Sequence, residues 1–509
     1  MTADPTLSGS NHRRARVVLA LLLAVFVVLS VKQVDNHPQL GVDEIYYYDY
    51  VLKSPSLGIR IGEQVGAEAM ATAGCRGIEI WPEELIPACG DPQPDPNQLW
   101  QSGYNVTFQH PPPYFTLTAW GGEVIGWLPG VDDKLHAYRL VGALWLVAGM
   151  SLLWYALGLA GLGTVAKAAL VALLGAPPAA LYVSTSVHAG NAQLVGGALL
   201  LVALLLWEAK RWPWWSVPIA AAAAMALNFN NAIAVGALVA YLAYLAWRDR
   251  GDKSDLLATA ASSFAVAVVS VIGWQLWQNH RKLADVQDLP IHQVIWGQKG
   301  FQWQQIDDEL RAVFTPFRDQ WIPTWDVLTP LNGIADIGLL VLLGATLAVT
   351  AQRSSHRYLT AGVVTAMAGM GVVTMLSTYA AGYNYFQLTP ARYGLALLPF
   401  AALAVAPAIR AIPLARLATA AVAVATGAAV AYGVFASVTP AQDADVVEAI
   451  RLSQQQQSII DQQDLISDQE QLLDDQQQLL DEKDNLLDLY RCQAGIDVHL
   501  VAGGCDPDN

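Results

Sequence analysis

The chain has 509 residues, of which 54% are hydrophobic and only 14% charged. These proportions exclude a protein built around a soluble core and predict that most of the chain is embedded in lipid. The formal net charge of −15 does not describe the whole chain, because much of the acid lies after residue 440, and no basic face interleaved with aromatic residues predicts nucleic-acid binding.

The N-terminus carries Arg13, Arg14 and Arg16 ahead of an apolar run of about 18 residues, an arrangement also typical of a signal peptide. No small-residue cleavage site follows the run around Lys32. We therefore expect residues 1–14 to be a cytoplasmic N-terminus followed by a retained signal anchor.

Runs long enough to cross a bilayer need about 20 apolar residues. The chain contains about eleven such runs, at roughly 15–34, 137–159, 164–183, 190–208, 212–228, 229–248, 255–278, 331–350, 357–379, 390–407 and 412–436. The run 113–129 is shorter and contains Glu123, and Gly121, Gly122 and Pro129 interrupt it, so it is predicted to be interfacial or re-entrant. The sequence thus predicts an all-α polytopic membrane protein whose transmembrane domain covers 15–436.

Orientation follows from the loops, because short cytoplasmic loops collect Lys and Arg. With the N-terminus cytoplasmic, every second loop carries basic residues: Lys167; Lys210 and Arg211; Arg248, Arg250 and Lys253; Arg353 and Arg357; Arg410 and Arg416. The large first loop 35–136, the second loop 279–330 and the C-terminus then lie outside. We expect a multi-pass protein of a bacterial plasma membrane.

Four cysteines fall into two local pairs, Cys75 with Cys89 and Cys492 with Cys505. Both pairs lie in polar segments on the predicted outer side, where disulfides persist. We predict two disulfides, Cys75–Cys89 and Cys492–Cys505; the alternative is four free thiols.

The tail from 441 to 490 is rich in Gln and Asp, and its apolar residues repeat every seven positions. They are Leu452, Ile459, Ile466, Leu473, Leu480 and Leu487, each flanked on the N-terminal side from 465 onward by a further Leu. This period predicts a long extracytoplasmic coiled-coil helix that either binds a protein partner or self-associates, followed by a cysteine-containing segment at 491–509. A solvated single helix is the other interpretation.

Asp43 and Glu44 follow the first span directly, and Tyr46 and Tyr47 come next. A carboxylate at the bilayer centre costs roughly 2.5–3.5 kcal/mol on insertion scales, so this pair is expected to face water at the outer surface. There a carboxylate can serve as a general base for an attacking hydroxyl. Adjacent residues point in different directions, so we assign the base to Asp43, while Glu44 positions the acceptor or holds the loop.

Arg392 and Arg139 open spans from the outer side, against the charge rule that the other loops obey. A guanidinium at the interface suits an anionic headgroup, because its planar fork binds phosphate oxygens in pairs. His110, before three prolines, either donates to the same phosphate or caps a rigid turn. Further candidate cleft residues are Gln387, Tyr393, His188 and Asn191, in addition to Tyr46 and Tyr47.

No HExxH, P-loop or CxxC motif is present. The sequence therefore predicts no metal site and requires no cofactor.

These stretches together resemble one family, the membrane glycosyltransferases of the GT-C fold, in the branch of protein O-mannosyltransferases and lipid A aminoarabinose transferases. The resemblance rests on four motifs in order: Asp43-Glu44-Ile-Tyr46-Tyr47, His110-Pro-Pro-Pro-Tyr114, Arg139-Leu140, and Arg392-Tyr393 followed by Leu398-Pro399. It covers about 15–436. The coiled-coil tail is not part of the shared pattern, and His188 to Asn191 stand where many relatives carry an acidic residue.

The resemblance implies a donor sugar carried on a polyprenyl phosphate, with Asp43 as base and with Arg392, Arg139 and His110 holding the phosphate. The implied reaction is an inverting transfer to a hydroxyl of an envelope glycan, lipid or protein. Two other functions stay open at this point: a transporter or flippase of a lipid-linked sugar, and an assembly scaffold organised by the coiled coil.

Overall fold

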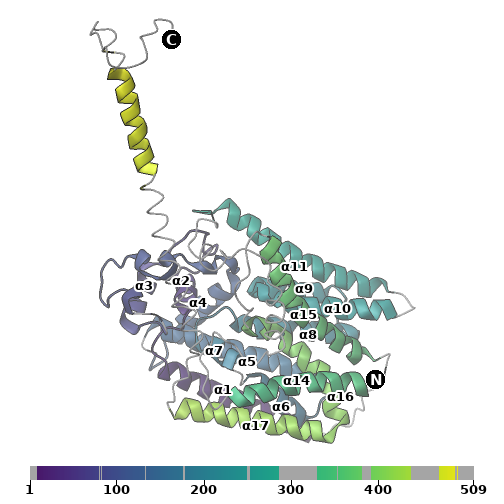
Figure 1. The fold of residues 1–509 in the computed structure, drawn as a ribbon. Helices are drawn as coiled ribbons and strands as arrows, with labels where there is room; N and C mark the ends of the chain where they lie inside the picture. The colour runs from purple at the N-terminus through teal and green to yellow at the C-terminus, as the bar shows by residue number, and fades with distance from the viewer. Residues whose placement is uncertain are drawn as a thin grey trace. The chain divides into compact units, whose positions relative to one another are not determined.

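A computed structural model describes residues 9–436 except for 80, 82, 132, 176–177, 249–252, 286–328, 352–353 and 381–390. In the tail it describes 469, 471–487 and 490. The chain divides into two compact units, Met1–Ala449 and Ile450–Asn509. The first unit is a bundle of helices (Figure 1), and the β-type pairings among its described residues are two isolated bridges, Leu40 with Ile78 and Gln64 with Tyr104.

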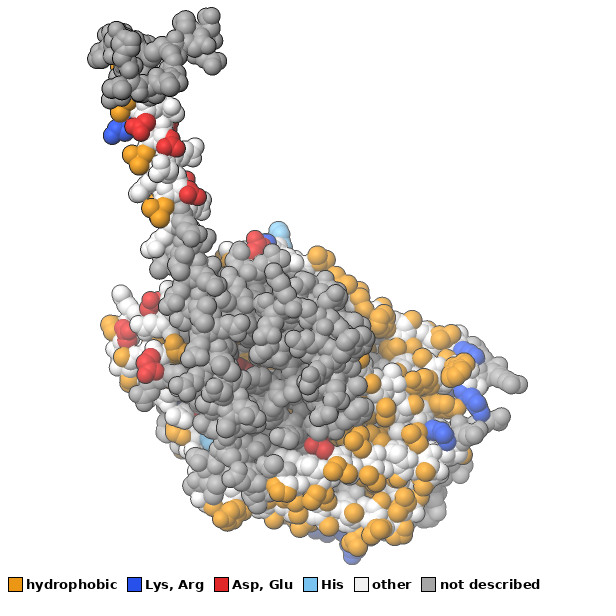
Figure 2. Space-filling model, viewed as in Figure 1, with side chains coloured by type: hydrophobic (Ala, Val, Ile, Leu, Met, Phe, Trp, Pro, Cys, Tyr) orange, Lys and Arg blue, Asp and Glu red, His pale blue; other side chains and the backbone are white. Residues whose placement is uncertain are grey.

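Eight helices of the described chain are long and apolar enough to cross a membrane. They are α1 (Gly9–Asn36), α5 (Lys134–Leu159), α8 (Asn191–Glu208), α10 (Ala232–Arg248), α11 (Ser254–His280), α14 (Thr329–Val349), α16 (Leu398–Ala411, preceded by η7, Ala391–Leu397) and α17 (Pro413–Phe435). Hydrophobic side chains cover much of the bundle's visible flank in Figure 2, as lipid-facing surfaces require. The chain is an all-helical, multi-pass membrane protein in its described first unit.

Two of the remaining predicted spans take a different form, and the third, 357–379, is a single helix. The expected span 164–183 is divided into α6 (Thr164–Gly175) and α7 (Pro178–Thr185), with a proline as the first residue of α7. The expected span 212–228 is the 12-residue α9 (Ser216–Leu227) with η5 (Phe229–Asn231) after it, and 357–379 lies in the 26-residue α15 (Ser355–Ala380). A helix of 12 residues is only about 18 Å long at 1.5 Å per residue, so α6 and α9 are shorter than a full crossing needs.

Sequence-distant helices pack side by side to form the bundle. Helix α5 contacts α8, α1 and α7; α10 contacts α15 and α11; α14 contacts α16; and α17 contacts α6. The interior is mainly Leu, Ala and Val, and small residues let backbones approach closely. At Gly197 on α8 an added Cβ would lie only 1.9 Å from the Ala396 carbonyl oxygen, so this glycine is what allows η7 to lie against α8.

The first predicted outer loop folds into short helices. It contains α2 (Glu44–Leu52), α3 (Ala67–Arg76), η1 (Glu83–Leu85), η2 (Pro96–Gln98), η3 (Trp100–Gly103) and η4 (Val106–Gln109). Helix α11 holds this loop from its C-terminal end, where Trp274 Nε1 and Gln278 Nε2 donate to the Phe108 carbonyl oxygen at 3.0 and 2.9 Å.

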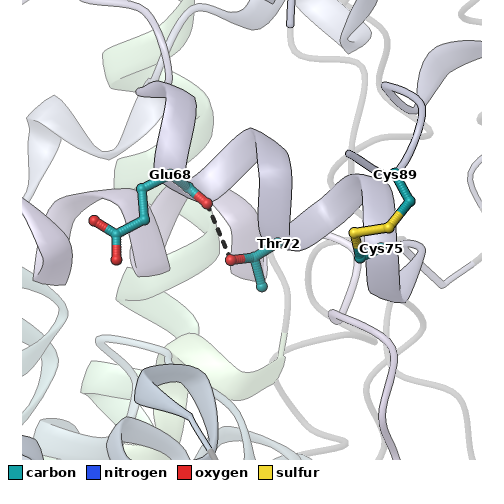
Figure 3. The surroundings of a disulfide bond; sticks show 4 residues. All are labelled: Glu68, Thr72, Cys75 and Cys89. Carbon is teal, nitrogen blue, oxygen red and sulfur yellow. Dashed lines mark hydrogen bonds between the residues drawn. A yellow bond between two sulfur atoms is a disulfide. The ribbon is translucent and has the colours of Figure 1, made fainter. Parts of the chain in front are cut away.

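The predicted Cys75–Cys89 disulfide is confirmed, and it joins the end of α3 to the loop after η1 (Figure 3). Inside α3, the Thr72 hydroxyl donates to the Glu68 carbonyl oxygen at 3.0 Å. The predicted Cys492–Cys505 pair lies outside the described residues.

Helix α4 (Pro113–Ile125) corresponds to the run predicted to be interfacial. With 13 residues it is too short to cross a bilayer. One side packs on α5, with Tyr114 and Phe115 fully buried, while Trp120 and Val124 on the other side are exposed. This distribution suits a helix lying along the membrane surface.

In the second unit, residues 471–487 form a helix (yellow in Figure 1). Its described part carries three of the predicted heptad leucines, Leu473, Leu480 and Leu487, on an exposed stripe. The remainder of the predicted segment 441–490 lies largely outside the described residues.

Candidate active site

The predicted site residues come together where four spans end. Asp43 follows α1, Arg139 lies near the start of α5, His188 precedes α8, and Arg392 lies in η7 just ahead of α16. Since these are ends of membrane-spanning helices, their meeting places Asp43, Arg139 and Arg392 at the same end of the bundle. The basic residues Lys210, Arg248 and Arg410 occupy the opposite ends of their helices.

Glu44 and Arg139 form a buried ion pair at the start of α2. The Arg139 Nε and Nη2 atoms donate to the two Glu44 oxygens at 2.8 and 2.5 Å, and both side chains are at most 4% exposed. Glu44 also accepts from the Gly41 and Val187 amides at 2.8 and 2.7 Å. The pair therefore ties the Asp-Glu loop to α5 and to the turn before α8.

Arg139 has two further acceptors, both backbone carbonyl oxygens. Its Nη1 donates to the His37 carbonyl oxygen at 2.5 Å and its Nη2 to that of Gln39 at 2.6 Å. The described donors of Arg139 thus go to Glu44 and to the segment that follows α1, and the phosphate contact expected for Arg139 stays a prediction. Glu44 was expected either to position the acceptor or to hold the loop, and its contacts with Arg139 and two backbone amides favour the second role.

Asp43, in contrast, faces the other way and remains accessible. It occupies the N-cap position of α2 but makes no side-chain cap hydrogen bond, and its side chain is 39% exposed. Its Oδ2 atom lies 3.3 Å from Nη2 of Arg392, whose side chain is only 7% exposed. An accessible carboxylate thus stands against a buried guanidinium that comes from the other end of the chain.

Arg392 is positioned through its backbone. With the Gln193 amide oriented to satisfy both of its ends, Gln193 donates to the Arg392 and Tyr393 carbonyl oxygens at 2.9 and 3.0 Å and accepts from Asn230 at 3.3 Å. The guanidinium carbon lies 5.6 Å from the centre of the Tyr393 ring, a cation–π distance. The close packing at Gly197 holds the same 3₁₀ segment against α8.

Aromatic rings form one wall of the site around Tyr47. The Tyr47 ring centre lies 4.4 Å from that of His188, 5.6 Å from that of His110 and 6.2 Å from that of Phe115. The Tyr47 hydroxyl is 3.4 Å from His110 Nε2. Tyr46 points elsewhere, with its ring 6.3 Å from the Trp81 ring, so of the two tyrosines only Tyr47 belongs to this wall.

Burial decides the protonation of these groups. It lowers the pKa of His110 to about 4, and burial together with the Arg392 charge lowers the pKa of His188 well below its usual value. Burial also raises the pKa of Tyr47 well above its usual value. Near neutral pH both histidines are therefore neutral and Tyr47 keeps its proton.

Asn191 lies behind this wall. Its Nδ2 atom donates to the Tyr114 hydroxyl at 3.2 Å, and the residue lines a small, mainly apolar cavity together with Ser184 and Leu395. Gln387 lies outside the described residues.

Sequence analysis did not identify Gln193 or the Val187 amide as parts of the site. A signal for Gln193 was present, because an uncharged polar residue two positions inside an apolar span is expected to bond within the bundle. The Val187 contact had no signal, since any residue can supply a backbone amide.

The fold and site together define a polytopic α-helical membrane protein with an accessible carboxylate and a buried guanidinium paired at one end of its bundle. Within the described ranges, no group of three or more His, Cys, Asp or Glu side chains could hold a metal ion.

No protein-family profile and no curated protein matches the chain. Among solved structures, the chain is similar to the crystal structure of ArnT from Cupriavidus metallidurans bound to undecaprenyl phosphate, with 16% identity and a TM-score of 0.44. The match covers 79% of this chain and 61% of the ArnT chain, so this chain spans less than two thirds of that protein. The function proposed below rests on the residues of this chain.

Proposed function

We propose that the chain is a glycosyltransferase of the GT-C type that moves a sugar from a polyprenyl-phosphate donor to a hydroxyl of an envelope acceptor. The observation that carries the proposal is the contact between Asp43 and Arg392. It pairs the two charges that such a reaction needs, a base for the incoming hydroxyl and a cation for the departing phosphate, at the membrane end where a lipid headgroup lies.

The two adjacent acids support a division of labour. Glu44 is buried and its oxygens are occupied by Arg139 and two backbone amides. Asp43 is accessible, and the contact described for it is one that an incoming anion would compete for. Binding of the donor phosphate would draw Arg392 toward the phosphate and release Asp43 to face the acceptor.

The chemistry is a single displacement. The acceptor oxygen forms a bond to the anomeric carbon while the bond from that carbon to the phosphate oxygen breaks. Asp43 takes the hydroxyl proton, and the phosphate leaves with the bonding electron pair, stabilised by Arg392. Attack from the face opposite the phosphate inverts the anomeric configuration. A phosphate leaving group needs little protonation near neutral pH, so one base suffices.

The reaction is proposed to occur on the outer face of a bacterial plasma membrane, with the N-terminus inside. Support comes from the charge pattern of the loops, with Lys210, Arg248 and Arg410 at the helix ends away from the site. The confirmed Cys75–Cys89 disulfide lies in the loop that carries Asp43, and disulfides persist in oxidising compartments.

The test is release of polyprenyl phosphate from a panel of polyprenyl-phosphate sugars carrying mannose, arabinose, glucose or galactose, with an envelope extract as acceptor. We expect wild type to turn over one donor and Asp43→Asn to lose about 10²–10⁴-fold in rate while still binding the donor. Asp35→Asn is the matched control, because Asp35 is an exposed acid at the end of α1, outside the site.

If wild type releases no phosphate from any donor although the extract supports a known transferase, the proposal fails. The transporter and scaffold interpretations would then be tested by donor translocation and by partner binding.

A further inference from the structure

The turn before α8 contains His188, whose tautomer is fixed and whose ring N–H has no hydrogen-bond acceptor among the described residues. His188 Nδ1 accepts a hydrogen bond from the Gly190 amide at 2.8 Å. That nitrogen therefore carries no proton, and the ring proton must be on Nε2. The tautomer is set by the backbone of the turn itself.

His188 Nε2 has no hydrogen-bond partner among the described residues, although the side chain is only 4% exposed. Buried donors are nearly always paired. The ring is held by Tyr47, whose ring centre is 4.4 Å away, and by Tyr182 at 6.5 Å. The Nε2–H group of His188 is therefore fixed in direction and available to donate a hydrogen bond to an oxygen atom of a ligand.

The charges around His188 indicate whether the ligand oxygen is anionic or belongs to a neutral hydroxyl. The Arg392 guanidinium and His110 both act on His188, and His110 is neutral near pH 7. The Asp43 carboxylate lies 3.3 Å from Arg392, and in the proposed reaction it turns to the acceptor when the donor phosphate binds. A buried cation whose charge acts on the same ring favours an anionic oxygen over a sugar hydroxyl.

We propose that His188 Nε2 donates a hydrogen bond to a phosphate oxygen of the polyprenyl-phosphate donor, beside Arg392. This inference rests on the proposed function and adds a second phosphate-binding group to it. The phosphate would then be held by one charged donor from η7 and one neutral donor from the turn before α8.

The test measures binding rather than turnover, with the full chain in nanodiscs and three probes: undecaprenyl phosphate, the uncharged polyprenol, and inorganic phosphate. His188→Ala should weaken undecaprenyl phosphate binding about tenfold and leave polyprenol binding unchanged. His188→Gln, whose amide nitrogen reaches the position of Nε2, should restore most of the affinity. His136→Ala, which changes a histidine outside the site, should have no effect.

The inference is overturned if His188→Ala binds undecaprenyl phosphate as wild type does, or if it loses affinity equally for the polyprenol, which would indicate a packing role. Binding of inorganic phosphate as tight as that of undecaprenyl phosphate would identify a free-anion site instead. If wild type does not prefer undecaprenyl phosphate to the polyprenol, the proposed function fails together with this inference.

A second inference comes from the tail helix 471–487 and is independent of the first. Its leucines form an exposed stripe of pairs seven residues apart: Leu472 and Leu473, Leu479 and Leu480, Leu486 and Leu487, each between 43% and 64% exposed. Residues seven apart lie on the same side of a helix, so the pairs form one leucine seam, in which Gln476 and Lys483 lie between successive pairs.

Acidic residues border this seam on both sides. Successive residues of an α-helix are rotated by 100° about its axis. On this helix Asp475 and Glu482 lie beside one edge of the leucine seam and Asp484 lies beside the other, while Lys483 lies between the leucines. Two copies of this helix would place like charges opposite each other at the edges of the seam. A helix with a leucine seam bordered by Lys and Arg would place opposite charges there.

We propose that the leucine seam of 471–487 binds a basic partner helix. The probes are two designed, labelled peptides with the same leucine heptads, one with Lys and one with Glu at the flanking positions, added to the full chain in nanodiscs. We expect the Lys peptide to bind, the Glu peptide not to bind, and Leu480→Asp to weaken binding at least tenfold. Gln478→Asp, on the opposite side of the helix, is the matched control.

Two results would overturn this inference. One is that neither peptide binds. The other is that mass measurements on the full chain show a dimer that Leu480→Asp dissociates, which would identify a second copy of the chain as the occupant.

Discussion

The same chemical change at two adjacent residues should have opposite consequences. Glu44→Gln removes the charge of a carboxylate buried against Arg139, whereas Asp43→Asn removes that of an accessible carboxylate beside Arg392. We expect the first variant to lose stability and the second to lose transfer activity while keeping its stability.

The magnitudes follow from burial. Breaking a buried ion pair on one side leaves the partner charge uncompensated and costs about 3–5 kcal/mol, and both members of the Glu44–Arg139 pair are at most 4% exposed. Asp43 is 39% exposed although Arg392 is buried, so water screens this carboxylate and the loss of its charge is expected to cost much less than that of Glu44, about 1 kcal/mol.

The assay is thermal unfolding of purified variants in one detergent, with transfer measured on the same preparations. The double variant Glu44→Gln with Arg139→Gln should be less damaged than the sum of the two single changes, because it leaves no buried charge unpaired. If Glu44→Gln unfolds within about 1 kcal/mol of wild type and is nevertheless inactive, Glu44 acts in the chemistry and the division of roles is wrong.

Three further predictions concern the surroundings of the site. Asn105 begins the glycosylation motif Asn105-Val-Thr107, but its buried side chain donates to the Tyr46 carbonyl oxygen and to Asp49. Asn105→Ala should therefore cost about 1–3 kcal/mol, and mass spectrometry should find Asn105 unglycosylated; a glycan there would contradict the structure. Gly197→Ala should destabilise by about 1–3 kcal/mol and reduce transfer, whereas Gly236→Ala, which has open space around it, should do neither; equal melting temperatures would refute the close packing of η7. Because the folded chain lowers the pKa of His110 to about 4, below its value of about 6.5 in the unfolded chain, stability present above pH 6.5 should be lost as the pH falls toward 4. The melting temperature of His110→Gln should fall less over that range, and identical profiles would exclude the effect.

The predictions that depend on the composition of one segment of the chain agree best with the structure. Hydropathy located the long spans, the length of the run near residue 120 excluded it as a crossing, and cysteine spacing predicted the Cys75–Cys89 disulfide. Each of these depends on a property of one segment and its solvent. The predicted spans at 164–183 and 212–228 were less well described, because composition does not show that one helix ends at Gly175, that the next begins at Pro178, or that α9 ends at Leu227.

The amino-acid sequence by itself determined that two acids follow the first span and that two arginines open later spans against the charge rule. It did not determine which acid meets which arginine. Glu44 pairs with Arg139 across 95 residues and Asp43 with Arg392 across 349, and both pairings depend on how α1, α5, α8 and η7 pack together. Only the tertiary structure buried one pair and left the acid of the other accessible, and that difference in solvent exposure separates the residue that holds the loop from the residue proposed to act as the base.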